Sequence, residues 1–475
     1  MNVALKNPGS FRDPSGAVFS VDGVIYRQVN RSFAPDFEVL NRSGLYEELV
    51  GRGLLVPHEE CSAPASLTGD PLCIIRPERI PFISYPHEWS FHQLKDAALC
   101  TLEIQDRAIA RGMTLKDATA YNIQFRGDRP VSIDTLSFER LVPGAPWVAY
   151  RQFCQHFLAP LALMSRRDVH LSRLGQLFMD GVPLELGSLL LPWRTRLRFG
   201  LQVHIHAHAR MQRRFAGSAA DTSRPTRSPQ MSAAALRGLV ESLRATVAGL
   251  EWAPRGTEWA DYYDATNYSS AGMDHKVATI DQWSGELQPK MVWDLGANTG
   301  RFSDVVANHA DVVVACDVDP AAVDRNYLRL REAKRGKILP LVMDLTNPTP
   351  GFGWAGEERM SFTERGPADL AVALALVHHL AISNNVPLPM IAQFLSRCAR
   401  HLIIEFVPKG DSQVRRLLST RPDIFPEYTR EGFEAAFGAY FVIERSEQVR
   451  DSERILYRMR IRSTRFTNGS NSPSP

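Results

Sequence analysis

The stretch Val292-Trp-Asp-Leu-Gly-Ala-Asn-Thr-Gly300 decides the fold of the second half of this chain. Residues 291–293 predict a short buried strand that ends at Asp294. Gly296 and Gly300 then enclose a tight turn, and the apolar spacing of the residues that follow predicts a helix. A strand, a glycine turn and a helix form the first unit of an α/β nucleotide site. The glycines let a ligand approach the backbone, and the helix N-terminus offers free N–H groups.

The glycine spacing is not that of a dinucleotide site, because that fingerprint requires glycines where this chain has Asn298 and Arg301. An acid two places before the first glycine, with another glycine four places after it, instead resembles motif I of the class I S-adenosylmethionine (SAM) methyltransferases. SAM carries no phosphate. Its sulfonium and α-amino groups favour a carboxylate such as Asp294 in the turn.

The strands that follow this motif also end in acids. Residues 311–317 predict a second strand that ends at Asp317, where a carboxylate can accept both hydroxyls of a ribose. Residues 338–343 predict a third strand, and Asp344 after it resembles the acid that contacts adenine in this methyltransferase family. A loop acid that caps a turn is the alternative interpretation of Asp344.

A fourth predicted strand, residues 369–375, is followed by Leu376-Val-His-His-Leu380. In many small-molecule methyltransferases the residues at this position face the reacting methyl group. The resemblance therefore implies that His379 or His378 is a base for an acceptor that must lose a proton. A packing or hydrogen-bonding role is the alternative for both histidines.

A fifth predicted strand, residues 401–407, is followed by a predicted antiparallel pair, residues 440–445 and 454–460. The resulting prediction is an α/β, doubly wound, Rossmann-like methyltransferase sheet of seven strands within residues 232–463. The resemblance implies SAM as the cofactor. Its binding residues would be Asp294, Gly296, Asn298 and Gly300 in the turn, Asp317 at the ribose and Asp344 at the adenine.

The N-terminal half predicts a different, α+β arrangement. A hairpin over residues 13–30 and a helix over 35–52 precede a long helix from Phe91 to Arg111, for which Ser90 is the cap. The loop after it holds three polar residues that resemble the catalytic loop and metal-binding acid of the aminoglycoside kinases: Asp117, Asn122 and Asp134. That resemblance implies a kinase-like domain over residues 1–215, in which the first acid positions an acceptor and the other two residues hold magnesium.

Three departures from the kinase pattern put phosphoryl transfer in doubt. No glycine-rich loop precedes residue 30, Arg27 stands where a lysine is expected, and Leu115 replaces the usual histidine. Asx-type turns would also explain three isolated polar residues. We therefore expect a degenerate kinase-like domain.

Composition gives the remaining boundaries. Residues 216–231 are rich in Ser, Thr, Pro and Arg and predict a linker, and residues 464–475 predict a disordered tail. Aromatic residues between 252 and 268, Tyr268 among them, would cover the SAM pocket or form an apolar cap. The alternating histidines of residues 203–208 predict solvated or core side chains and no metal site.

The net charge of +3 does not predict a nucleic-acid or membrane partner. Six scattered cysteines and the absence of a long apolar run predict a cytoplasmic protein with reduced thiols. The full-length pattern, including Tyr150-Arg-Gln-Phe-Cys-Gln-His-Phe157, resembles the NoeA-like family of bacterial nodulation proteins. This resemblance implies a methyltransferase for a small-molecule or saccharide acceptor. A bifunctional methyltransferase/phosphotransferase and a non-catalytic SAM-binding regulator remain the alternatives, and the sequence leaves the oligomeric state open.

Overall fold

The computed structural model describes residues 4–62, 67, 69–217, 231–253, 268–419 and 421–462. The chain divides into two compact units: Met1–Ala260 with Asp317–Arg365 (unit 1), and Asp261–Cys316 with Gly366–Pro475 (unit 2). These units do not coincide with the predicted ranges 1–215 and 232–463. Most of the predicted linker and the whole predicted tail lie outside the described residues, so those two boundaries stay predictions.

The predicted sheet has seven strands, as expected, in the order β12-β11-β10-β13-β14-β16-β15. In unit 2, β10 is parallel to β11 and β13, and β13 is parallel to β14. The terminal pair is antiparallel, and β16 lies between β14 and β15. The strands are β10 (Met291–Leu295), β11 (Val312–Asp317), β12 (Ile338–Val342), β13 (Ala368–Ala373), β14 (Ala399–Phe406), β15 (Phe441–Gln448) and β16 (Ile455–Ile461).

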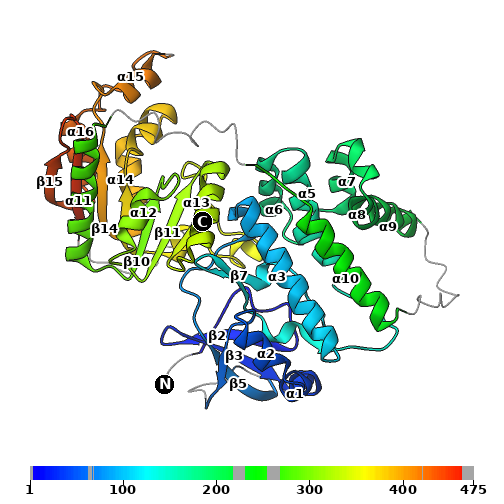
Figure 1. The fold of residues 1–475 in the computed structure, drawn as a ribbon. Coiled ribbons are helices and arrows are strands. Elements are labelled where there is room, and N and C mark those ends of the chain that lie inside the picture. The colour runs from blue at the N-terminus through cyan, green and yellow to red at the C-terminus, as the bar shows by residue number, and fades with distance from the viewer. Residues whose placement is uncertain are drawn as a thin grey trace, which may run out of the picture. The chain divides into compact units, whose positions relative to one another are not determined.

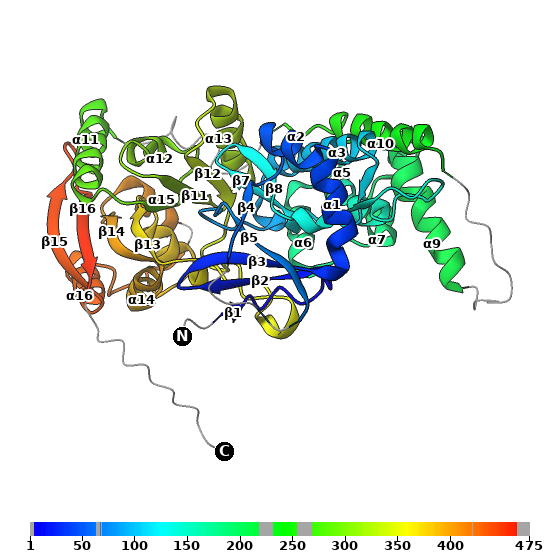
Figure 2. The same ribbon diagram turned by 90° about the horizontal axis from the view of Figure 1, so that it is seen from below.

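Helices cover both faces of the sheet in unit 2, which confirms the doubly wound arrangement. Figure 2 shows α11 and α12 on one face and α14 and α16 on the other. The apolar strand residues and the large side chains Trp283, Trp293 and Tyr457 are almost fully buried between these layers. The helices are α11 (Ser270–Leu287), α12 (Arg301–Val306), α14 (Leu388–Cys398), α15 (Ser412–Leu418) and α16 (Arg430–Gly438).

Unit 1 begins with a five-stranded antiparallel sheet in the order β1-β2-β3-β5-β4. The predicted hairpin is present, and Asp22 and Gly23 form its turn with positive φ angles. The predicted helix over 35–52 is two helices, because Gly44 takes a left-handed φ of 73° between them. The elements are β1 (Leu5–Lys6), β2 (Gly16–Val21), β3 (Val24–Asn30), α1 (Ala34–Arg42), α2 (Leu45–Gly51), β4 (His58–Glu60) and β5 (Pro71–Pro77).

The long predicted helix is α3 (Phe91–Ala110), and Ser90 caps it by accepting a hydrogen bond from Gln93 N. Within unit 1, α10 (Ala233–Ala248) lies alongside α3 (Figure 1), and α13 (Pro320–Ala333) also packs against α3. Residues on both sides of the predicted linker therefore share one core. Short strands follow α3: β6 (Met113–Leu115), β7 (Ile123–Arg126), β8 (Arg129–Ser132) and β9 (Phe138–Arg140).

The rest of unit 1 is helical in short pieces. The helical stretch that begins at Leu184 is interrupted after Leu190, because Pro192 cannot continue the backbone hydrogen bonding. The pieces are α4 (Tyr150–Phe153), η5 (Cys154–Leu158), α5 (Ala159–Arg166), η6 (Val169–Arg173), α6 (Leu174–Leu177), α7 (Leu184–Leu190), η7 (Trp193–Leu197), α8 (Phe199–Leu201), η8 (Gln202–Ala207) and α9 (His208–Gly217).

The alternating histidines lie in η8 and α9. His204 and His206 are both buried. His204 forms hydrogen bonds with the hydroxyls of Tyr150 and Ser242. His206 forms hydrogen bonds with the hydroxyls of Ser188 and Thr195. This confirms the interpretation of these two histidines as core residues.

No helix in the described part of the chain is both long and apolar enough to cross a membrane. The six cysteines form no disulfide.

Candidate functional site

The glycine turn after β10 has the backbone that its sequence predicts. Gly296, Asn298 and Gly300 have φ angles of 81°, 50° and 85°, all in the left-handed region. The amides of Gly296 and Ala297 both donate to the carbonyl of Cys316 at 2.9 Å. A side chain at Gly296 would be strained by the positive φ, although its Cβ would only reach ordinary contact with Leu376 Cδ1 at 3.4 Å. The turn therefore depends on glycine at positions 296 and 300, where the backbone is left-handed.

Asp294 is the buried acid of this turn, with 2% of its surface exposed. Ser303 Oγ, in the first turn of α12, donates to Asp294 Oδ2 at 2.6 Å. The carboxylate is therefore oriented by the helix that follows the turn. Asn298 Oδ1 accepts from the amide of Thr299, which helps to hold the turn in shape.

Asp317 and Asp344 belong to unit 1. Asp317 is the last residue of β11, is 8% exposed, and accepts a hydrogen bond from the amide of Asp319 at 2.9 Å. Asp344 follows β12, is half-buried, and accepts from the amide and the hydroxyl of Thr346 at 2.9 and 2.6 Å. Asp344 thus caps a turn, which was the alternative interpretation, and a contact with adenine stays a prediction.

His378 is the N-cap residue of the short helix η12 (His379–Ser383), which follows β13, and His379 is its first residue; the two ring centroids are 4.1 Å apart. His378 is fully buried, and neither of its ring nitrogens has a hydrogen-bond partner among the described residues. Burial lowers the pKa of His379 to about 4, with a further contribution from Arg454. Both imidazoles are therefore neutral near pH 7, and each is a weak proton acceptor.

A buried charged network in unit 2 was missed by the sequence analysis. Glu405, near the end of β14, accepts from Lys276 Nζ at 2.7 Å, from the amide of Ala375 at 2.8 Å and from the hydroxyl of Tyr268. Arg454 donates to both carboxylate oxygens of Asp411 at 2.7 and 3.0 Å. Arg454 also donates to the Tyr268 hydroxyl at 2.8 Å, which joins the two ion pairs.

Electrostatics keeps Glu405 ionised in this network, whereas burial lowers the pKa of Lys276. Burial alone would raise the pKa of Glu405, but the charges of Lys276 and Arg454 outweigh burial and lower it. An acid inside an otherwise apolar strand, residues 401–407, was the signal that could have revealed the network, because a buried carboxylate requires a partner. The network fixes α11 and the end of β14 relative to each other.

Tyr268 was predicted to help cover a cofactor. In the structure its ring lies 4.8 Å from Lys276 Nζ and 4.5 Å from the Arg454 guanidinium carbon. Two cations of the chain itself therefore contact this ring. Of the other aromatic residues in that prediction, Trp259, Tyr262 and Tyr263 lie outside the described residues.

The three predicted kinase-like residues of unit 1 lie together. Burial raises the pKa of Asp117, the Asp134 carboxylate raises it further, and a hydrogen bond from Asn122 opposes the rise. However, Arg27 Nη1 lies 2.5 Å from Asp134 Oδ1. Asp134 also accepts hydrogen bonds from the amide of Leu136 at 2.9 Å and the hydroxyl of Ser137 at 2.7 Å.

These contacts occupy the acid that would bind magnesium in a kinase. Within the described ranges, no group of three or more His, Cys, Asp or Glu side chains is arranged to hold a metal ion. The structure thus brings Asp117, Asn122 and Asp134 together. It also pairs Asp134, the predicted metal ligand, with Arg27, which stands where a kinase has its strand lysine.

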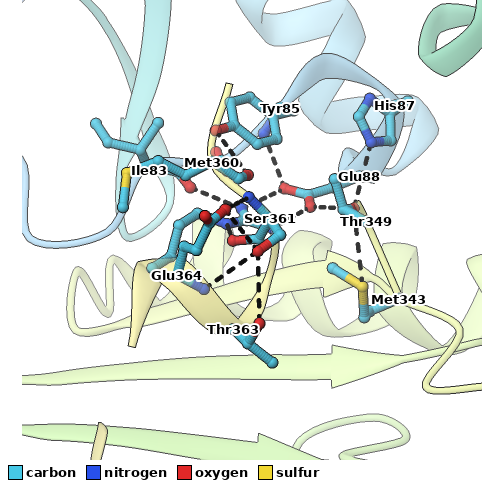
Figure 3. Close-up of polar contacts among 12 residues, drawn as sticks. Ile83, Tyr85, His87, Glu88, Met343, Thr349, Met360, Ser361, Thr363 and Glu364 are labelled. Atoms are coloured by element: carbon cyan, nitrogen blue, oxygen red, sulfur yellow. Dashed lines mark hydrogen bonds and ion pairs between the residues drawn. The ribbon is translucent and has the colours of Figure 1, made fainter. Parts of the chain in front are cut away.

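A second buried network joins residues far apart in the sequence of unit 1, and Figure 3 shows Glu88 at its centre. Thr349 Oγ1 donates to Glu88 Oε1 at 2.6 Å, and the amide of Tyr85 donates to Glu88 Oε2 at 2.9 Å. The Tyr85 hydroxyl donates to the carbonyl of Met360 at 3.1 Å. Residues 349–360 are therefore held against the segment that leads into α3.

Together, the sheet order, the covering helices and the glycine turn define a doubly wound α/β fold in which β10 is followed by a turn with left-handed backbone. The chain belongs to the family of the nodulation protein NoeA: it is 34% identical to NoeA of Rhizobium meliloti (strain 1021) over 453 residues, 94% of each protein. No protein-family model matches the chain.

Solved structures of methyltransferases are similar to part of the chain. The N-methyltransferase NodS from Bradyrhizobium japonicum WM9, in complex with S-adenosyl-L-homocysteine, is 14% identical, with a TM-score of 0.32; the match covers 43% of this chain and 93% of NodS. Magnesium protoporphyrin IX methyltransferase from Synechocystis PCC 6803, with bound S-adenosylhomocysteine, is 17% identical, with a TM-score of 0.31, over 43% of this chain and 92% of that one. Identities and scores this low transfer no property to this chain.

Proposed function

We propose that this protein is a SAM-dependent methyltransferase that acts on a small-molecule or saccharide acceptor. The observation that carries the proposal is the turn 294–300, in which a buried acid precedes three residues with left-handed backbone. This is the turn that the motif resemblance predicts, and it follows the first strand of a sheet with the predicted strand number and antiparallel terminal pair.

The residues present fit the cofactor. Asp294 and the backbone of Gly296, Asn298 and Gly300 would hold its amino-acid end, because a carboxylate and an open backbone suit a charged α-amino group. Asp317 would accept hydrogen bonds from the ribose hydroxyls. Asp344 would contact the adenine ring after β12.

Little acid–base chemistry is required of the chain. SAM supplies a methyl group already activated on a sulfonium, so positioning and exclusion of water supply most of the rate. Where the acceptor atom carries a proton, His379 or His378 would accept it, and their low pKa restricts this role to acceptors that are themselves weakly basic. The neutral imidazoles would otherwise orient the acceptor by hydrogen bonding.

For the N-terminal half we propose a kinase-like shape without phosphoryl transfer. The proximity of Asp117, Asn122 and Asp134 supports the shape. The ion pair between Arg27 and Asp134 supports the loss of activity, because Asp134 is the predicted magnesium ligand.

The direct test of methyl transfer uses SAM labelled in the methyl group, the purified full-length protein and a fractionated bacterial extract. Formation of S-adenosylhomocysteine together with label in a small-molecule or saccharide fraction supports the proposal. Binding of SAM with no product in any fraction would favour the non-catalytic regulator instead. Asp317→Ala is the matched negative control.

A further inference from the structure

Four large apolar side chains of unit 1 stand in solvent within eleven residues of sequence. Leu189 is 79% exposed, Trp193 67%, Leu197 77% and Phe199 78%. They lie on α7, η7 and α8, which pack with η8 and α9 (Figure 1). Single exposed apolar residues are ordinary, and these four differ in that they lie on three consecutive short helices.

Local hydrogen bonds hold this surface in place. Thr195, in the middle of η7, is buried, and its hydroxyl bonds to Pro192 O at 2.6 Å and to His206 Nε2 at 2.8 Å. His206 also bonds to Ser188 in α7 through Nδ1 at 2.8 Å. Because these bonds anchor the inner side of η7, Trp193 and Leu197 on either side of Thr195 remain outside.

Arginines are interleaved with the apolar residues. Arg194, Arg196 and Arg198 are all exposed, and none of them has an ion-pair partner among the described residues. Residues 186–213 contain five arginines and no acid, whereas the net charge of the whole chain is only +3. The positive charge is therefore concentrated where the apolar side chains are exposed.

We propose that this apolar–arginine surface (Leu189, Trp193, Leu197 and Phe199 with Arg194, Arg196 and Arg198) docks the protein on a lipid bilayer that carries anionic headgroups. Apolar side chains, a tryptophan and unpaired arginines together match the boundary between acyl chains and phosphate headgroups. The protein would lie on such a bilayer and not cross it, consistent with the absence of a spanning helix among the described residues.

Charge complementarity selects this partner over a second copy of the chain. A symmetric dimer through this surface would bring two sets of unpaired arginines together, and like charges at an interface oppose association. Phosphate headgroups would instead pair with the arginines. A surface charge of this kind predicts binding that weakens as salt is added.

The test is sedimentation of the full-length protein with vesicles of phosphatidylcholine alone and of phosphatidylcholine mixed with phosphatidylglycerol. We expect binding to the anionic vesicles only. Replacing Arg194, Arg196 and Arg198 by Gln should weaken it on the order of 100-fold, since each arginine near the headgroups contributes roughly fivefold. Leu197→Ser with Phe199→Ser should weaken it more than about tenfold.

Matched controls lie elsewhere in the chain. Arg415→Gln with Arg416→Gln removes two exposed arginines of α15, and Trp354→Ala removes a single exposed tryptophan. Both control variants should bind vesicles like the wild type. Circular dichroism of every variant checks that it is folded.

Trp193→Phe gives a second readout. This variant keeps an apolar side chain, so it should still sediment with anionic vesicles. The blue shift of tryptophan fluorescence that we expect for the wild type on binding should be smaller in this variant. Equal binding to neutral and anionic vesicles, binding unchanged by the surface substitutions, or a wild-type dimer that Leu197→Ser with Phe199→Ser converts to a monomer would each overturn the proposal.

Discussion

Arg365 donates to both carboxylate oxygens of Glu88, at 2.6 and 2.9 Å, although 277 residues separate the two. Both side chains are almost fully buried. The guanidinium also lies 4.7 to 5.7 Å from the ring centres of Phe82, Tyr85 and Phe362. Burial alone would raise the pKa of Glu88, but Arg365 outweighs it and the pKa is lowered. The pair therefore stays ionised and joins the N-terminal residues of unit 1 to Asp317–Arg365.

Glu88→Gln should destabilise unit 1 strongly. The substitution leaves the buried Arg365 without its counter-charge, and breaking a buried pair from one side costs about 3–5 kcal/mol. Urea unfolding followed by circular dichroism measures the change in the free energy of unfolding. The matched control is Glu38→Gln, which removes the exposed partner of Arg42 and should change that free energy by less than about 0.5 kcal/mol. Equal changes in the free energy of unfolding for the two substitutions would show that the buried pair stabilises the protein no more than an exposed pair does.

Glu405→Gln should destabilise unit 2 and change its response to acid. The folded-state pKa of Glu405 is lowered, so its contribution is complete above the unfolded pKa near 4.5 and is lost as the pH falls through the folded value. Wild type should therefore lose more stability than Glu405→Gln between pH 5 and pH 3, in thermal unfolding measured across that range. The exposed Glu431→Gln should follow the wild type. Parallel curves for wild type and Glu405→Gln would contradict the ionised network.

Acid should also destabilise unit 1, through His156 and at a higher pH than the range in which Glu405 affects unit 2. Burial lowers the pKa of His156 from 6.5 to about 4, so the unfolded chain takes up a proton in this window while the folded chain does not. Its contribution is complete above pH 6.5 and is lost as the pH falls towards 4, by roughly 1.4 kcal/mol per pH unit. In His156→Gln the free energy of unfolding should depend less steeply on pH, because about one proton fewer is taken up on unfolding. A slope that is unaffected in His156→Gln would refute the assignment.

The N-terminal half should not transfer phosphate. Labelled ATP, magnesium and candidate acceptors incubated with the full-length protein should give no labelled product, because Arg27 occupies Asp134 and no glycine-rich loop is present. Phosphate transfer that disappears in Asp134→Asn would show that this half is an active kinase.

Local patterns predicted the fold of the sheet well. Short apolar runs, each followed by a turn or an acid such as Asp317, are sufficient to locate parallel strands, and the glycine turn at 296–300 specifies its own backbone. The dipeptide Ser43-Gly44 is a turn signal that could have predicted the break between α1 and α2. The apolar spacing on both sides of it favoured a single helix instead. The local backbone decided the outcome there, because Gly44 takes a left-handed φ.

The partners of buried charges could not be predicted from the sequence. Glu405 and Lys276 are 129 residues apart and meet only because α11 packs near the end of β14. The same holds for Glu88 and Arg365. A lone acid in an apolar segment indicates that a partner exists, and only the tertiary fold identifies that partner.

Calorimetric binding of S-adenosylhomocysteine to the wild-type protein, Asp317→Ala and Asp311→Ala is the decisive test of the proposed SAM site. Asp311 is exposed at the opposite end of β11 and serves as the control. We predict binding to wild type and to Asp311→Ala. In Asp317→Ala the affinity should fall by at least about 100-fold, since two charge-assisted hydrogen bonds of about 1.5–3 kcal/mol each are removed. No binding to the wild type, or equal binding to all three proteins, would contradict a SAM site at Asp317.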